Sequence, residues 1–131
     1  MPIKDNVVPA SDGAGVVEET GPRVSRFKKG DKVMTLFNQA HIAGSMTPAI
    51  KMTSLGGTID GTLTQYGTFD ENGLVAMPET LDFQQASTLS CAALTAWNAL
   101  YGLDSRALKP GEVVLTQGTG GVSIFAVQVR L

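Results

Sequence analysis

A glycine-rich turn near the C-terminal end offers the clearest chemistry in this sequence. The stretch EVVLTQGTGGVS at residues 112–123 predicts a strand over 112–117, a turn of glycines, and a helix over 121–131. A glycine directly after the strand permits a tight exit, and a second glycine lets the backbone approach a pyrophosphate. The free N–H groups and the dipole at the start of the helix favour an anion. The pattern therefore predicts a dinucleotide-binding turn made of Gly118, Thr119, Gly120, Gly121 and Val122.

Three features of the motif and its surroundings restrict this interpretation. The dinucleotide fingerprint G-x-G-x-x-G ends here in Ser123, a residue small enough for the helix to pack closely on the strand. The residue that reads the ribose is expected about 20 residues beyond the turn, past Leu131. A second parallel strand is missing as well, and a lone strand cannot form a parallel sheet. A plain strand-to-helix turn remains the alternative.

The residue types needed for metal or nucleophilic chemistry are scarce. Cys91 is the only cysteine and His41 the only histidine, so the chain can form neither an internal disulfide nor a multi-cysteine zinc site. We expect Cys91 to be a small buried hydrophobic residue and His41 to be a solvated loop residue. A single cysteine also suits a reducing compartment.

Composition and charge favour a globular protein without a polyanionic partner. Of the 131 residues, 43% are hydrophobic and 17% are charged, and the formal net charge is −2. The basic residues between 23 and 32 are interrupted by a turn signal, so we expect a solvated hairpin shoulder rather than a phosphate-contacting patch. No apolar run approaches the roughly 20 residues that span a bilayer, and the N-terminus lacks the apolar region of a signal peptide. We expect a cytoplasmic protein with no nucleic-acid or membrane partner.

The elements that must position the candidate residues change from strands to helices along the chain. Alternating apolar residues predict strands over 32–37 and 62–69, and short apolar runs next to turn signals predict strands over 14–19 and 74–77. Residues 38–61 have no period and predict a long irregular loop. A helical spacing of apolar residues extends from Asp82 to Leu103, with a capping box of Asp82 and Gln85 and a left-handed Gly102 at its end. Trp97 is expected to pack in a core or between domains.

An ordered string of motifs carries a family resemblance. The motifs are SDGAGVVEETG, FKKGDKVMTLF, GTLTQYGTF, LVAMPETLDFQQASTLSCAALTAWNAL and LKPGEVVLTQGTGGVS. Together, over residues 5–128, they resemble the medium-chain dehydrogenase/reductase superfamily, most of all its quinone-oxidoreductase and zinc-type alcohol-dehydrogenase-like branches. The resemblance implies a mostly β fold, with a co-chaperonin-like (GroES-like) β-domain over 1–80 and interdomain helices over 81–108. The truncated start of a Rossmann dinucleotide-binding domain would follow over 109–131.

The resemblance implies an NAD(P)-dependent oxidoreductase that transfers hydride between NADPH or NADH and a carbonyl, quinone or enone. Zinc enzymes of the family carry a G-H-E-x-x-G stretch whose histidine binds zinc. This chain has Ser11 in place of that histidine, and serine is not a normal zinc ligand. Cys91 matches a cysteine ligand of the zinc branch but stands alone. The resemblance therefore implies the metal-free branch, with NADP or NAD as cofactor and no zinc. Full-length members of the family can also form homodimers.

Without zinc, hydrogen-bond donors and the positioned cofactor must polarise the carbonyl. Asp12 and Thr95 are the candidate catalytic residues, and Thr95 and Asn38 are candidate cofactor contacts. Thr95 lies in the ALTAW stretch, which comes close to the nicotinamide in the family. Each residue also has a purely structural interpretation. Thr95 can bond back to a helix carbonyl, Asp12 can close its own turn, and Asn38 can begin a loop.

Compared with the family pattern, the chain is short at both ends. Family members have further strands before the NVVP stretch and continue the last helix beyond Arg130-Leu131. We therefore expect a fragment that binds NADPH weakly or not at all. A zinc-type alcohol dehydrogenase and a non-catalytic binding or dimerisation module are the alternative functions.

Overall fold

The computed structural model describes residues 3–130, and its backbone divides into two units. Unit 1 comprises Met1–Ser90 and unit 2 comprises Cys91–Leu131. Each unit is considered by itself below.

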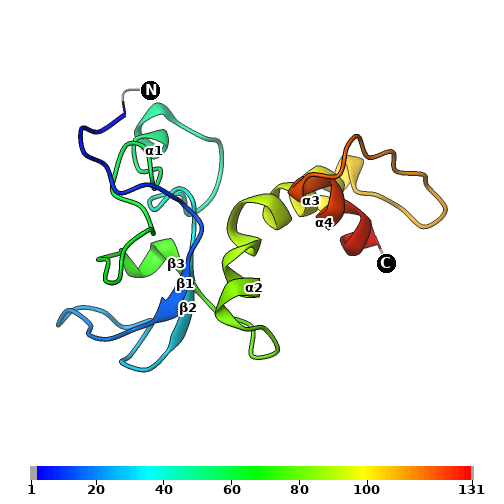
Figure 1. Cartoon of the computed structure of the whole chain (residues 1–131). Helices are drawn as coiled ribbons and strands as arrows, with labels where there is room; N and C mark the ends of the chain where they lie inside the picture. Colours follow the sequence, from blue (N-terminus) through cyan, green and yellow to red (C-terminus); the bar gives the residue numbers. More distant parts are fainter. Residues whose placement is uncertain (1–2, 131) are drawn as a thin grey trace. The chain divides into compact units, whose positions relative to one another are not determined.

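Three short antiparallel strands form the sheet of unit 1 (Figure 1). They are β1 (Ala14–Val16), β2 (Lys32–Thr35) and β3 (Leu74–Ala76), in the order β1-β2-β3. Met34 in the central strand lies opposite Ala14 on one side and Val75 on the other. Three of the predicted strands are therefore present but shorter than predicted. Beyond their ends a few backbone bonds continue the pairing, such as Val17 N–H to the Asp31 carbonyl at 2.9 Å and Leu36 N–H to the Gly73 carbonyl at 2.8 Å.

Both faces of β2 are covered, which the sequence pattern does not show. Val33, Met34 and Thr35 are all buried, although their alternation predicts one covered face. Helix α2 (Phe83–Ser87) packs on β1 and β2. The core consists of Met34, Met77 and Ala86, with partly buried Ala14, Val75, Leu81 and Leu89 around it.

Residues 62–69 form no strand, so that prediction was wrong. Consecutive N–H groups of residues 61–63 donate to carbonyls of residues 8–10, at 2.7 to 3.1 Å. An antiparallel ladder uses alternate residues instead. Thr64 N–H then donates to the Thr62 carbonyl at 2.8 Å, and this three-residue turn ends the extended segment.

Residues 38–61 are mostly irregular, as predicted. Their one helix is α1 (Pro48–Lys51), a single turn that Thr47 caps by accepting the Ile50 N–H at 3.2 Å. Isolated bridges join Asn38 to Ser54 and Leu55 to Ile59. A short 3-10 turn, η1 (Glu71–Gly73), precedes β3.

The predicted helix over 82–103 is present but interrupted. The capping box is confirmed, because Asp82 accepts the Gln85 N–H at 2.7 Å and Gln85 Oε1 accepts the Asp82 N–H at 3.1 Å. After α2 comes a π-helical turn, η2 (Leu89–Ala93), and then α3 (Leu94–Tyr101). Gly102 has a φ of −68°, so the left-handed end was wrong. Leu103 ends the helix instead by becoming extended before the 3-10 turn η3 (Asp104–Arg106).

Helices α3 and α4 (Gly121–Arg130) pack together in unit 2 (Figure 1), and each buries an alanine, Ala96 and Ala126 respectively. The helix predicted over 121–131 is confirmed as far as Arg130, and its last residue lies outside the described part. Trp97 lies 4.9 Å from Tyr101 between ring centres. It is 55% exposed, so it is not a core residue.

The strand predicted over 112–117 does not form. Val113 is 87% exposed and Leu115 is 90% exposed. A strand needs a neighbour for its backbone hydrogen bonds, and residues 3–130 provide none for this segment. The β structure is therefore smaller than the mostly β fold that we expected, and only the turn and helix of the predicted βα unit are present.

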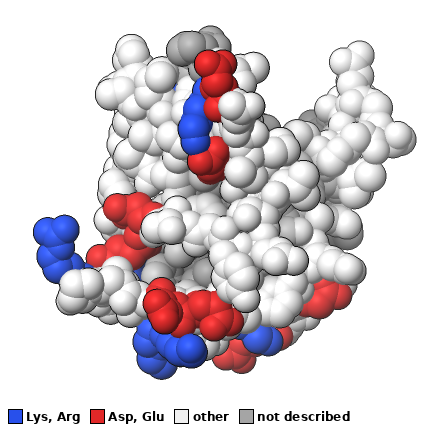
Figure 2. Space-filling view, turned by 60° about the vertical axis from the view of Figure 1, so that its left-hand side comes forward, with Lys and Arg blue, Asp and Glu red and all other residues white. Residues whose placement is uncertain are grey.

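The surface charges are mixed on the face shown in Figure 2. Acidic and basic side chains alternate along its lower edge, without a broad patch of one sign. In the part of the chain that the structure covers, every helix is too short or too polar to cross a bilayer.

Candidate functional site

Asp12 lies on a turn that threonine hydroxyl groups fix. Thr35 Oγ1, which is buried, donates to the Ser11 carbonyl at 2.9 Å and accepts the Gly13 N–H at 3.0 Å. Thr62 Oγ1 donates to the Asp12 carbonyl at 2.9 Å. Ser11 Oγ donates to Asp12 Oδ1, also at 2.9 Å. The backbone on both sides of the half-buried Asp12 is therefore held from β2 and from the segment that follows residue 61, and the carboxylate is bonded by Ser11.

The backbone just before this turn is strained. Ala10 has a φ of +69°, a left-handed conformation that costs a residue with a Cβ about 1 to 3 kcal/mol. Backbone from residues 56–63 holds it there, because Thr62 N–H donates to the Ala10 carbonyl at 2.9 Å. Such strain is frequent at functional sites, so it favours a functional role for the neighbouring Asp12.

The chemistry of Asp12 differs from that of a hydrogen-bond donor. An ionised carboxylate accepts hydrogen bonds and donates none. In that form Asp12 can orient a hydroxyl group but cannot polarise a carbonyl. Its bond from Ser11 leaves the second carboxylate oxygen available as an acceptor.

Asn38 begins the irregular loop of unit 1. It is half-buried, and its carbonyl accepts the His41 N–H at 3.2 Å. The His41 ring contacts the Gly44 carbonyl at 3.1 Å through Nε2, which makes Nε2 the protonated nitrogen. These bonds are local to the loop and favour the structural interpretation of both residues.

Thr95 lies one residue inside α3. Its hydroxyl donates to the Cys91 carbonyl at 2.7 Å, so its single proton is already used. The oxygen remains available only as an acceptor. Cys91 itself is exposed, so the expected burial of this residue was wrong.

The glycine turn of unit 2 is open. Gly118 has a φ of +79°, and a Cβ added at Gly118 or Gly120 would meet no atom within 4 Å. The first bond of α4 runs from Ile124 N–H to the Gly120 carbonyl at 3.0 Å. Within residues 3–130, no protein acceptor faces the N–H groups of residues 118–123. The turn therefore presents free donors at the start of a ten-residue helix, which is the arrangement that binds phosphate.

The donor set does not fit a catalytic zinc ion. Ser11 is engaged with Asp12, and Cys91 is the only thiol. Among residues 3–130, no group of three or more His, Cys, Asp and Glu side chains gathers closely enough to hold a metal. Catalytic zinc sites use three such protein ligands.

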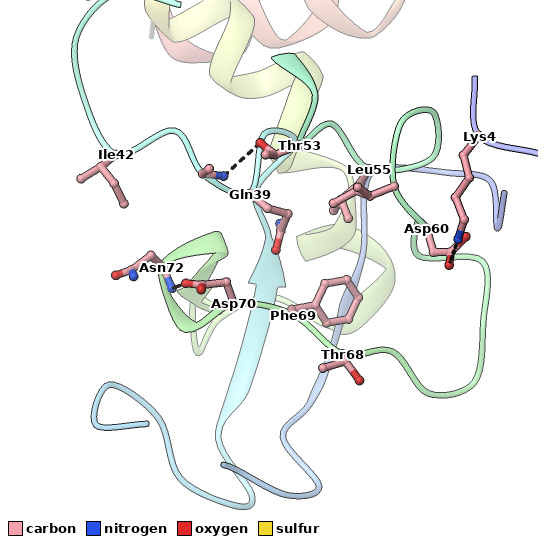
Figure 3. Close-up of a pocket in the computed structure, with 12 residues that line it drawn as sticks. Lys4, Gln39, Ile42, Thr53, Leu55, Asp60, Thr68, Phe69, Asp70 and Asn72 are labelled. Carbon is pink, nitrogen blue, oxygen red and sulfur yellow. Dashed lines mark hydrogen bonds and ion pairs between the residues drawn. The ribbon is translucent and has the colours of Figure 1, made fainter. Parts of the chain in front are cut away.

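A hollow of about 700 Å³ opens elsewhere on unit 1 (Figure 3). Ile42, Leu55 and Phe69 supply apolar walls, and charged side chains lie at its edge. Gln39 is buried there and donates from Nε2 to the carbonyls of Leu36 at 2.7 Å and Gly73 at 3.0 Å. None of the predicted site residues lines this hollow, so it is not our candidate for the chemistry.

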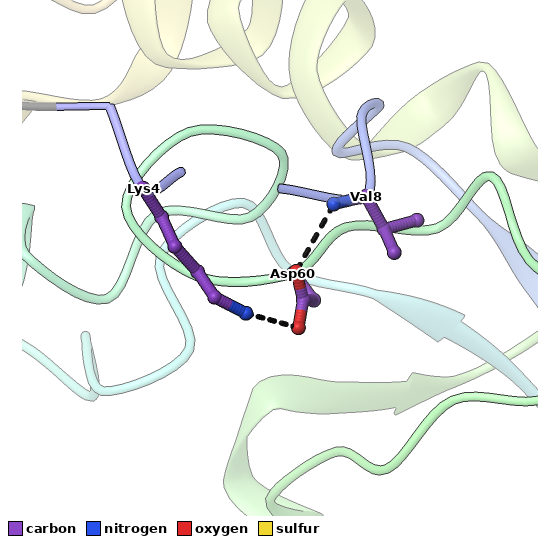
Figure 4. Close-up of polar contacts among 3 residues, drawn as sticks. All are labelled: Lys4, Val8 and Asp60. Carbon is purple, nitrogen blue, oxygen red and sulfur yellow. Dashed lines mark hydrogen bonds and ion pairs between the residues drawn. The ribbon is translucent and has the colours of Figure 1, made fainter. Parts of the chain in front are cut away.

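An ion pair at the edge of the hollow fixes the N-terminal segment. Lys4 Nζ donates to Asp60, and the Val8 N–H donates to the other carboxylate oxygen at 3.0 Å (Figure 4). These two hydrogen bonds hold the pKa of Asp60 below its ordinary value, and the bond from Lys4 has the larger effect. The contribution of these contacts to the stability of the folded state is therefore present at neutral pH and is lost as the pH falls through the lowered pKa of Asp60.

Sequence reasoning did not identify the residues that support the site. Thr35, Thr62 and Gln39 hold the Asp12 turn and the nearby loop through hydrogen bonds. One signal was available for Thr35, which is a polar residue in the middle of an apolar strand. The bond of Thr62 to the Asp12 carbonyl and that of Gln39 to the Gly73 carbonyl join distant segments and leave no local pattern.

Comparison with known protein families identifies the family to which this chain belongs. The family model described as the alcohol dehydrogenase GroES-like domain matches residues 1–79. The chain belongs to this family. The GroES-like β-domain that the motifs imply is thereby confirmed, and so is the resemblance to the medium-chain dehydrogenase/reductase superfamily.

Relatives of this GroES-like chain are named as oxidoreductases. A zinc-type alcohol dehydrogenase-like protein of Schizosaccharomyces pombe is 44% identical over 131 residues, which are 100% of this chain and 38% of the relative. Human quinone oxidoreductase is 34% identical over 122 residues, which are 92% of this chain and 30% of that protein. The chain thus spans less than two fifths of the length of either relative.

Solved structures of alcohol dehydrogenases show the same fold. A protein described as an alcohol dehydrogenase from Sinorhizobium meliloti 1021 has a TM-score of 0.86 and 42% identity, covering 97% of this chain and 38% of that one. A cobalt- and zinc-bound thermostable alcohol dehydrogenase from Pyrobaculum aerophilum has a TM-score of 0.76 and 32% identity, covering 94% of this chain and 38% of that one.

Proposed function

We propose that the protein is an NAD(P)-dependent oxidoreductase that transfers hydride between a nicotinamide and a carbonyl, quinone or enone without a metal ion. The observation that carries the proposal is the open glycine turn at the start of α4, in a chain of the alcohol dehydrogenase GroES-like family. We keep the division into residues 1–80, 81–108 and 109–131 as part of this proposal. A cytoplasmic location and a homodimer belong to it as well.

The proposal gives each candidate residue one role. The bound dinucleotide supplies or accepts the hydride. The N–H groups of Gly118, Thr119, Gly120, Gly121 and Val122 hold its pyrophosphate. Thr95, whose proton is committed to the Cys91 carbonyl, accepts a hydrogen bond from an amide such as that of the nicotinamide. Asp12 orients a hydroxyl group of the substrate or product, and the Asn38 amide supplies a donor.

A zinc-type alcohol dehydrogenase is the second candidate, because the relative from Schizosaccharomyces pombe carries that name. The engaged Ser11 and the solitary Cys91 argue against it. The third candidate is a non-catalytic binding or dimerisation module, which the unpaired segment 112–117 supports.

A chimera tests the proposal. In it, the matching stretch of the Schizosaccharomyces pombe relative is replaced by residues 1–131 of this chain, and the unaltered relative is the control. We expect the chimera to oxidise NADPH or NADH with a quinone, an enone or an aldehyde, and to keep this activity after dialysis against a chelator. Activity that depends on added zinc would favour the second candidate. A folded chimera without activity would favour the third.

A further inference from the structure

Ser123 makes a hydrogen bond across the glycine turn. It occupies the third position of α4, and its Oγ donates to the Gln117 carbonyl at 2.9 Å. Gln117 is the last residue before Gly118, so this one bond joins the entry of the turn to the first turn of the helix. The side chain is half-buried, which fits a defined orientation.

We propose that Ser123 is the positioning residue of the phosphate-binding turn, an inference that rests on the proposed function. Three of the four residues at positions 118–121 are glycines, the most flexible residue type. No atom lies near the Cβ position of Gly118 or Gly120, so side-chain packing does not restrain them. The Ser123 hydroxyl fixes the turn before an anion arrives, and this ordering lowers the entropic cost of binding.

The role explains the departure of this chain from the dinucleotide fingerprint. A glycine at position 123 would allow close packing but could not bond to the Gln117 carbonyl. The Ser123 proton is committed to that carbonyl, so the side chain has no proton to donate to the anion. Ser123 therefore acts through the backbone of the turn and not by contact with the ligand.

The test uses the full chain, inorganic pyrophosphate and the amide signals of an NMR titration. Pyrophosphate should shift the signals of residues 118–122 in the parent chain. Ser123→Ala should weaken this binding about fivefold, equivalent to about 1 kcal/mol, and should lower the NMR backbone order parameters of residues 118–121. Ser123→Thr keeps the hydroxyl and should restore both. Amide hydrogen exchange at Ala126, which is buried in α4, should be unchanged in all three proteins.

The outcomes separate this inference from the proposed function. If the parent and Ser123→Ala bind pyrophosphate equally at residues 118–122, the positioning role is wrong while the anion site stands. If Ser123→Ala also loses protection at Ala126, the role is only structural and the inference is overturned. If pyrophosphate shifts none of these signals in the parent chain, the same comparison is made in the chimera. Absence of a shift there as well means that the phosphate-binding turn itself is wrong and that both proposals fail.

Discussion

Replacement of Gly61 by alanine is expected to lower the free energy of unfolding of unit 1 by about 3 kcal/mol, the upper part of the usual range for overpacking. A Cβ at Gly61 would lie 1.8 Å from the Ala10 carbonyl oxygen and 2.6 Å from that of Pro9. Both obstacles are backbone atoms, which cannot rotate away as a side chain can. They are also tied to residues 62 and 63 by hydrogen bonds of 2.9 and 3.1 Å. Urea denaturation followed by circular dichroism measures the loss.

Gly57 provides the matched control, four residues earlier in the same segment. A Cβ at Gly57 would meet no atom within 4 Å. Gly57→Ala should therefore stay within about 1 kcal/mol of the parent, because a tolerated alanine mainly restricts the unfolded chain. Equal stability of Gly61→Ala and Gly57→Ala would contradict the close approach of the two backbones beside Asp12.

NADPH is expected to bind the 131-residue chain at least about a thousandfold more weakly than the chimera, the ratio between millimolar and micromolar dissociation constants. Contacts at an exposed helix end contribute about 0.3 to 1 kcal/mol each, whereas millimolar binding already requires about 4 kcal/mol. The chain also has no partner for segment 112–117 among its described residues. Titration of NADPH fluorescence with each protein measures the difference. Micromolar binding by the chain alone would mean that a second copy completes the site.

The strands and caps that form were largely predictable because their signals are local. Turn residues bracket β1, β2 and β3, and the capping box of Asp82 and Gln85 lies within four residues. The glycine turn and α4 were predictable for the same reason. Their chemistry depends on backbone N–H groups, which a run of glycines and a following apolar helix are enough to indicate.

The strand predictions that were wrong depend on backbone hydrogen-bond partners that are distant in the sequence or absent from the described residues. Residues 62–69 alternate like a strand, but their backbone bonds to residues 8–10 end at Leu63. Residues 112–117 are rich in β-branched residues, as a strand would be, but have no neighbour among the described residues to pair with. The site shows the same limit. The π-helical turn η2 before α3 was not predicted, although the bond of Thr95 back to a helix carbonyl was.

The most direct test of the central claim, that the glycine turn of unit 2 binds the dinucleotide pyrophosphate, is the NADPH affinity of the chimera with Gly120→Val. A Cβ at Gly120 meets no protein atom within 4 Å, so we expect only the small fall in melting temperature that a less favourable residue before a helix causes. The new side chain would occupy the space through which the pyrophosphate approaches the backbone. We predict a loss of affinity of at least about 100-fold, equivalent to about 2.7 kcal/mol, with a smaller loss for Gly120→Ala. Unchanged NADPH affinity in a folded Gly120→Val chimera would contradict the claim.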